Sequence, residues 1–182
     1  MTKQFDVIVI GANAIDEEGN AAMMAGSVGG NRPGLGLAAL TSEGAAVIIA
    51  AGLEKLIPGT IRDAMMAAGR KGVDKSIGMA VGLLPLTGRL VTEKEALEIL
   101  ADVRASVIGA GGVFGGEGST VLVAEGEPAE AEKIFALALE IKGASASSFP
   151  DSLPECAGPN PRCVSHLGCI YKAGYAGKRS GK

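Results

Sequence analysis

The residues best suited to metal or sulfur chemistry lie together towards the C-terminal end of the chain. All three cysteines and the only histidine fall within 14 residues, as Cys156, Cys163, His166 and Cys169. Three thiolates and one imidazole are a donor set for tetrahedral zinc, and two-residue gaps such as those between the last three donors are typical of zinc sites. Three thiolates also suit an iron–sulfur cluster. We therefore expect a Cys3His metal site that holds zinc, with an iron–sulfur cluster as the alternative.

Two other interpretations of this cluster stay open. The cysteines can form a redox or regulatory disulfide, or they can be unpaired thiols that are neighbours by coincidence. The six residues between Cys156 and Cys163 exceed the usual spacing of a zinc-binding pair. The odd number of cysteines, and the lack of a charged leader or cleavage site around residues 5–10, favour a reducing cytoplasm. We expect a cytoplasmic protein.

Polar and glycine-rich segments next to expected strands form a second group of candidates. Gly11, Asn13 and Asp16 follow the apolar run at residues 5–10, and ligands of open α/β sheets bind beyond the carboxyl ends of strands. Asn13 and Asp16 can offer an amide and a carboxylate to a ligand, although ordinary turns use the same residue types. A second segment precedes an expected helix, where backbone N–H groups and an arginine suit a phosphate or carboxylate. Its candidate residues are Gly29, Gly30, Asn31 and Arg32.

Glu54 and Lys55 are the candidate catalytic residues, because they place an acid and a base just beyond an expected strand. One of them can act as a general base if its neighbours tune its pKa. An ordinary solvated pair at a helix entrance is the simpler interpretation, and the sequence favours it.

The segment 109–118 contains six glycines in ten residues. A strand is expected after it instead of a helix, so it is not a dinucleotide-binding fingerprint. Its backbone can close over a ligand, or it can be a flexible hairpin loop. The ligand-contacting candidates are Gly111, Gly112, Gly115, Gly116 and Glu117.

Several of these segments together resemble lactate-utilisation (LUD) domain proteins. The resemblance rests on residues 6–15 (DVIVIGANAI), the pair Glu18-Gly19, residues 30–32 (GNR), and residues 47–52 (VIIAAG) with Lys55 three positions on. It covers roughly residues 5 to 66. It implies a fold shared with ribose-5-phosphate isomerase, the CoA transferases and related sugar-phosphate enzymes.

The elements that must position these residues alternate in the first half of the chain. Apolar periodicity predicts strands at residues 5–10, 45–51 and 76–86 and helices at 35–40 and 57–69. Residues 13–31 are predicted to be a polar, glycine-bearing connection that interrupts any helix. Alternation of this kind implies a parallel sheet. Further on, Thr92 and Glu95 form a capping box before a helix. Strands are then predicted at 105–110 and 119–124, and a last helix from Glu127-Pro128 to Gly143.

We therefore expect the α/β class, with a parallel or mixed sheet covered by helices on both faces and an α+β second half. Residues 1–143 form a ligand-binding domain in this interpretation. Residues 144–182 form a tail rich in Pro, Ser and Gly, and the bound metal holds this tail in place.

Composition and charge narrow the functional classes. Hydrophobic residues make up 47% of the 182, which allows one sizeable core, and no apolar run is long enough for a membrane span. The net charge is −3, but five of the 17 basic residues lie at 160–182 without an acidic residue, so the remainder carries −8. A short basic terminus of this kind does not favour nucleic-acid binding.

We expect a cytoplasmic homo-oligomer that binds a small anionic metabolite, phosphorylated or acyl in nature, and that carries the Cys3His site. Whether it also turns the metabolite over is not decided by the sequence. The alternative is a non-catalytic redox or iron–sulfur accessory subunit that docks on a redox protein partner through its tail.

Overall fold

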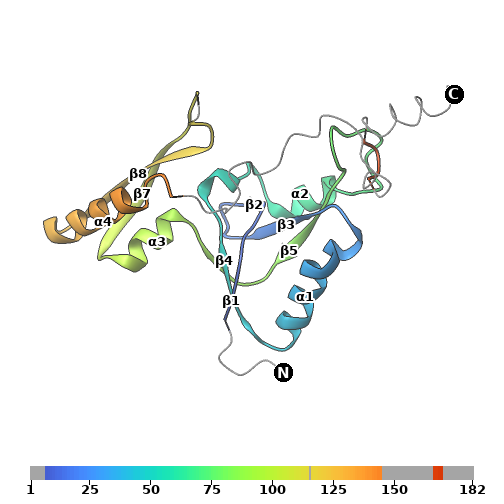
Figure 1. The fold of residues 1–182 in the computed structure, drawn as a ribbon, viewed down its shortest axis with the longest axis horizontal. Coiled ribbons are helices and arrows are strands. Elements are labelled where there is room, and N and C mark those ends of the chain that lie inside the picture. The colour runs from blue at the N-terminus through green and yellow to red at the C-terminus, as the bar shows by residue number, and fades with distance from the viewer. Residues whose placement is uncertain (1–6, 115, 145–165, 170–182) are drawn as a thin grey trace.

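The computed structural model describes residues 7–114, 116–144 and 166–169 (Figure 1). The fold is α/β, as predicted. The strands are β1 (Val7–Ile10), β2 (Ala14–Ile15), β3 (Ala21–Ala25), β4 (Ala46–Ala50), β5 (Gly82–Leu86), β6 (Arg89–Val91), β7 (Val103–Gly111) and β8 (Ser119–Gly126). The helices are α1 (Asn31–Ser42), α2 (Ile61–Ala67), α3 (Glu93–Leu100) and α4 (Pro128–Ile141), with 3₁₀ turns η1 (Val28–Gly30) and η2 (Leu53–Lys55).

The first sheet is parallel and has the strand order β1-β4-β6. The predicted strands at residues 5–10 and 45–51 supply β1 and β4. The sequence analysis did not identify β6, because three residues between Gly88 and Thr92 are too few to show a period. All three strands run in the same direction, so their carboxyl ends meet at one edge of the sheet.

The second sheet is antiparallel, with the order β2-β3-β5. The prediction that residues 13–31 form only a polar connection is therefore wrong, since β2 and β3 lie there. The sequence Ala-Ala-Met-Met-Ala of β3 has little intrinsic preference for a strand, but Ala21, Ala22 and Ala25 are buried, and burial outweighs propensity here. The predicted strand at 76–86 is shortened to β5, because Gly78 has a positive φ of 85°.

Side-chain hydrogen bonds from capping residues stabilise the first turns of α2 and α3. Helix α2 starts after Pro58, where the Thr60 hydroxyl accepts a hydrogen bond from the Asp63 N–H at 3.1 Å. The capping box predicted for Thr92 and Glu95 is confirmed at the start of α3.

The third sheet is the antiparallel hairpin β7–β8, as predicted, with a bulge at Ile108. Helix α3 packs on β7 and α4 packs on β8. We call residues 92–144 the hairpin unit. In Figure 1 this unit lies on the opposite side of the parallel sheet from α1.

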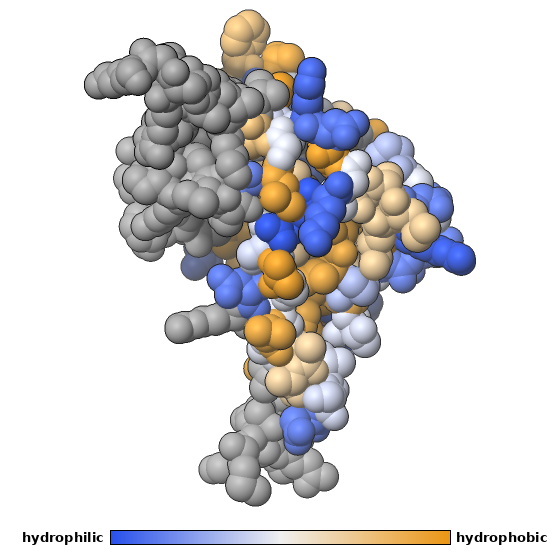
Figure 2. All heavy atoms as spheres, turned by 90° about the vertical axis from the view of Figure 1, so that its right-hand side faces the viewer, coloured by the Kyte–Doolittle hydropathy of each residue, from blue (hydrophilic) through white to orange (hydrophobic). Residues whose placement is uncertain are grey.

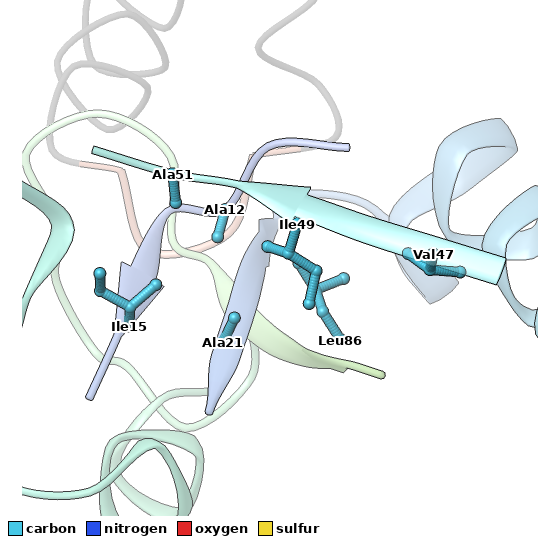
Figure 3. Close-up of a cluster of buried hydrophobic side chains, with 7 residues drawn as sticks. All are labelled: Ala12, Ile15, Ala21, Val47, Ile49, Ala51 and Leu86. Carbon is cyan, nitrogen blue, oxygen red and sulfur yellow. The ribbon is translucent and has the colours of Figure 1, made fainter. Parts of the chain in front are cut away.

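The largest buried cluster lies where β4 of the parallel sheet meets the antiparallel sheet (Figure 3). Ile15 and Ile49 are its most deeply buried side chains, each 1% exposed. The other members are Ala12, Ala21, Val47, Ala51 and Leu86. Three of the seven members are alanines, so the cluster buries little side-chain volume, and many larger apolar residues of the described chain stay exposed. Figure 2 shows hydrophobic residues interspersed with hydrophilic ones on the surface nearest α1.

Candidate functional site

The carboxyl edge of the parallel sheet gathers three segments that are distant in sequence. Gly11 follows β1, Gly52 and η2 follow β4, and Glu93 comes two residues after β6. This edge is where open α/β sheets bind ligands. The fold therefore brings the loop of Gly11 and the pair Glu54–Lys55 to the same side of one sheet.

Glu93 ties this edge to the hairpin unit. Its Oε2 accepts a hydrogen bond from the Leu53 N–H at 2.8 Å. A side chain at Gly52 would collide with the carboxylates of both Glu54 and Glu93, so these two carboxylates flank the Gly52 backbone. The sequence analysis missed Glu93. The only local signal was its place in the first turn of a capped helix, which indicates helix stabilisation and not contact with η2.

Glu54 and Lys55 form an ion pair, with Lys55 Nζ and Glu54 Oε1 3.5 Å apart. Each side chain is 39% exposed, so both groups are accessible to a ligand and to water. An exposed pair of this kind contributes little to stability, about 0 to 1 kcal/mol.

The glycine-rich segment 109–118 joins β7 to β8 and reaches the same edge. A Cβ placed on Gly118 would lie 3.4 Å from the Glu54 Cβ, in ordinary van der Waals contact. Phe114 has a positive φ of 55° and is completely exposed. Gly111 and Gly112 also adopt positive φ values, Glu117 is exposed, and Gly115 lies outside the described residues. The loop and Glu54 were separate candidates in the sequence, and the fold makes their segments neighbours.

Asp16 is a buried anchor of the local structure, only 4% exposed. Its carboxylate accepts four hydrogen bonds, from Ile61 N (2.9 Å), Asn20 N (2.9 Å), Asn20 Nδ2 (3.0 Å) and Glu18 N (3.1 Å). Burial alone would raise the pKa of Asp16, but these hydrogen bonds outweigh it and hold the pKa below the ordinary value. Asp16 thus joins the β2–β3 turn to the first residue of α2.

The remaining ligand-binding candidates lie around β3. Asn13 is exposed, and its Oδ1 accepts a hydrogen bond from Met24 N at 2.8 Å. The turn from β3 into α1 contains Gly29, Gly30 and Asn31, and all three have positive φ values. Arg32 is the next residue, in the first turn of α1. A pocket of about 530 Å³ borders Gly29, and its described lining comes from α1, β5 and their neighbours, without Asn13, Glu54 or Lys55.

Neither of the two larger cavities has Glu54 or Lys55 in its lining. One of about 540 Å³ is bounded by the β2–β3 turn, α2 and β5, with Glu18, Asn20 and Arg62 in its lining. The other, of about 640 Å³, lies between α3, α4 and β8, is mainly apolar, and reaches the carboxyl edge at Glu93.

Two of the four expected metal ligands are described. Cys169 is buried, 4% exposed, and pairs with Ser76 in an isolated parallel bridge. The Ser76 N–H donates to the Gly168 carbonyl at 2.8 Å. His166 is half-buried, whereas Cys156 and Cys163 lie outside the described residues. Within residues 7–114, 116–144 and 166–169 no group of three or more metal-binding side chains forms.

Comparison with known proteins adds no relative, since no family model, no curated protein and no solved structure matches this chain. The resemblance to LUD domain proteins stays a prediction. No helix in the described ranges combines the length and the apolar character needed to cross a bilayer.

Proposed function

We propose that the carboxyl edge of the parallel sheet binds a small anionic metabolite, phosphorylated or acyl in nature. The observation that carries this proposal is the position of the Glu54–Lys55 pair on η2, directly beyond β4 and tied through Leu53 to Glu93 after β6. Lys55 supplies the positive charge, and Gly11 and Gly52 keep side chains away from the backbone at this edge.

The charged side chains at this edge restrict the orientation of a bound ligand. Glu54 and Glu93 repel an anion, so the anionic group contacts Lys55, and an uncharged hydroxyl or acyl part of the ligand faces the carboxylates. In any turnover, Glu54 is the group placed to accept a proton, with Lys55 as its ion-pair partner.

A ligand panel tests this proposal. Thermal unfolding of the full chain is measured with sugar phosphates, CoA esters and nucleotides. At least one class should raise the midpoint, since a ligand that binds only the folded state stabilises it. Lys55→Met should abolish that shift. Lys133→Met should keep it, because Lys133 forms a similar surface ion pair with Glu130 at 3.6 Å on α4. An unchanged shift in Lys55→Met, or no shift with any ligand, contradicts the proposal.

We also propose that Cys156, Cys163, His166 and Cys169 hold one zinc ion. Two observations support this site: the chemistry of the four donors and the position of Cys169. The donor set is tetrahedral in type, and Cys169 is already buried and docked on Ser76. Four ligands leave no open position on the metal, so the zinc serves as a structural staple.

Elemental analysis of protein purified without added metal tests the proposed zinc site. One zinc per chain is expected, and Cys163→Ser should lower that value. A brown protein with visible absorbance contradicts the zinc proposal and supports the iron–sulfur accessory subunit that docks on a partner. A colourless protein without metal contradicts both.

A further inference from the structure

We propose that two copies of this chain associate through the free edge of β8, forming a continuous four-stranded antiparallel sheet with the order β7-β8-β8-β7. This inference concerns assembly and does not depend on the proposed ligand or metal site.

The hairpin unit exposes more apolar surface than its size requires. Of the 20 large hydrophobic residues that are exposed in the described part of the chain, 11 lie in its 53 residues. Helices α3 and α4 pack on its two-stranded sheet, and packing of this kind is what a hairpin needs for stability in water. Even with both helices in place, the exposed apolar residues leave a surface that a partner can cover.

The two edges of the hairpin differ. On the β7 side, the Ala105 N–H donates to Glu98 Oε1 of α3 at 3.0 Å, so a side chain already occupies that edge. On the β8 side, no strand of the described ranges pairs with the outer edge. The open edge is therefore the one along β8.

The register shows which groups this edge presents. Ala105 lies opposite Ala124, and Val107 lies opposite Leu122. Because the Ala105 N–H points towards Glu98, away from β8, Ala105 and Ala124 form a non-hydrogen-bonded pair. The same alternation makes Leu122, two residues before Ala124, direct its N–H and C=O outward. An incoming strand can bond to both.

The sequence of β8 fits a second copy of itself. Residues 120–124 read Thr-Val-Leu-Val-Ala, which is almost symmetric about Leu122. Antiparallel pairing about that residue places Leu122 opposite Leu122 and Val121 opposite Val123 of the other copy. Glu125 then falls opposite Ser119, so no like charges face each other. Cross-strand pairs of β-branched residues stabilise such a sheet.

Helix α4 adds apolar area on the helix-covered face of the hairpin. Phe135, Leu139 and Ile141 are each 57–60% exposed, and Phe135 and Ile141 line the 640 Å³ groove together with Leu122 of β8. With Val121 and Val123, these side chains offer roughly 400 Å² of apolar surface per copy, taking about 150–200 Å² for each full side chain. A stable interface buries about 800 Å² per partner, somewhat more than half of it apolar. The available area therefore matches that of an ordinary dimer.

Sedimentation velocity of the full chain over a range of concentrations tests the proposal. The expected species has twice the 18.2 kDa mass of one chain. The double variant Val121→Lys, Val123→Lys places lysines opposite each other across the two-fold axis, so it should shift the dimer dissociation constant at least tenfold towards monomer. Ile108→Lys is the matched control, because Ile108 is 64% exposed in the same hairpin but lies in the β7 bulge. Circular dichroism checks that every variant is folded.

Amide hydrogen exchange gives a readout specific to this edge. The Leu122 and Ala124 amides should become more protected as the protein concentration rises, whereas the double variant should lose this dependence. A monomer at every concentration overturns the proposal. So does a dimer that survives the double substitution, or one in which the Leu122 and Ala124 amides stay unprotected.

Discussion

The Glu93 carboxylate, at the first residue of α3, accepts a hydrogen bond from the backbone N–H of Leu53, 40 positions earlier in the chain. This contact joins the end of the parallel sheet to the hairpin unit and fixes η2, which carries Glu54 and Lys55.

Replacing Glu93 with Gln should reduce the free energy of unfolding by about 1 kcal/mol. The neutral amide accepts a weaker hydrogen bond and loses the favourable interaction of a negative charge with the start of a helix. Urea denaturation measures the change. Glu132→Gln is the control, since Glu132 is exposed in the middle of α4. Equal losses in both variants would show that the Leu53 contact contributes nothing of its own.

Gly88→Ala should destabilise the protein by about 1–3 kcal/mol, because a methyl group there would lie 2.6 Å from the backbone carbonyl oxygen of Val47, which cannot move aside without shifting β4. Gly36 of α1 offers the opposite case. Nothing lies within 4 Å of a Cβ at that position, so Gly36→Ala should stabilise the helix by about 0.5–1 kcal/mol. Thermal or urea unfolding of the two variants should therefore move in opposite directions, and movement in the same direction contradicts the crowding at Gly88.

The pH dependence of stability should report on Asp16. Its folded-state pKa lies below the ordinary value of 3.8, so folding is favoured when the carboxylate is charged. The resulting stability is fully present above pH 3.8 and is lost as the pH falls through the folded-state pKa. Asp16→Asn should cost about 1–3 kcal/mol at pH 7, because a buried hydrogen-bonding network is broken.

The same substitution should also flatten the decline of stability in acid, as measured by urea unfolding at a series of pH values. Asp74→Asn serves as the comparison, since it removes an exposed carboxylate. An Asp16→Asn variant with an unchanged acid slope would contradict the linkage.

Thr92→Ala should lower stability by about 1 kcal/mol through loss of the helix cap. Thr92 is 6% exposed, its hydroxyl accepts from the Lys94 N–H at 3.2 Å, and the Thr92 N–H donates to Glu95 Oε2 at 2.9 Å. Thr87→Ala is a suitable control, because Thr87 is exposed and lies outside the helices and strands. If the two variants unfold alike in urea, the capping box does not stabilise α3.

Features encoded by adjacent residues could be predicted from the sequence. The capping box at Thr92 needs only four residues, and the β7–β8 hairpin is flanked by β-branched residues and closed by glycines. Strands β2 and β3 were missed because Ala14 and residues 21–25 resemble a loop or helix in composition, and only tertiary burial makes them strands.

The candidate site was predictable to a similar degree. The sequence places Glu54 and Lys55 after a strand, and that assignment holds. Nothing local indicates that Glu93 bonds to Leu53, or that Gly118 lies beside Glu54, because both contacts depend on how the hairpin unit packs against the parallel sheet. Asp16 shows the converse, since a residue type suited to ligands is engaged by backbone N–H groups of its own turn and of Ile61, 45 positions away.

The bond between Ser76 and Gly168 has a consequence for biosynthesis. The acceptor for the Ser76 N–H belongs to a residue that the ribosome adds long after it has made the loop between α2 and β5. This loop cannot reach its final form on the nascent chain until Gly168 has emerged, so every residue between the loop and Gly168 is translated before the loop closes.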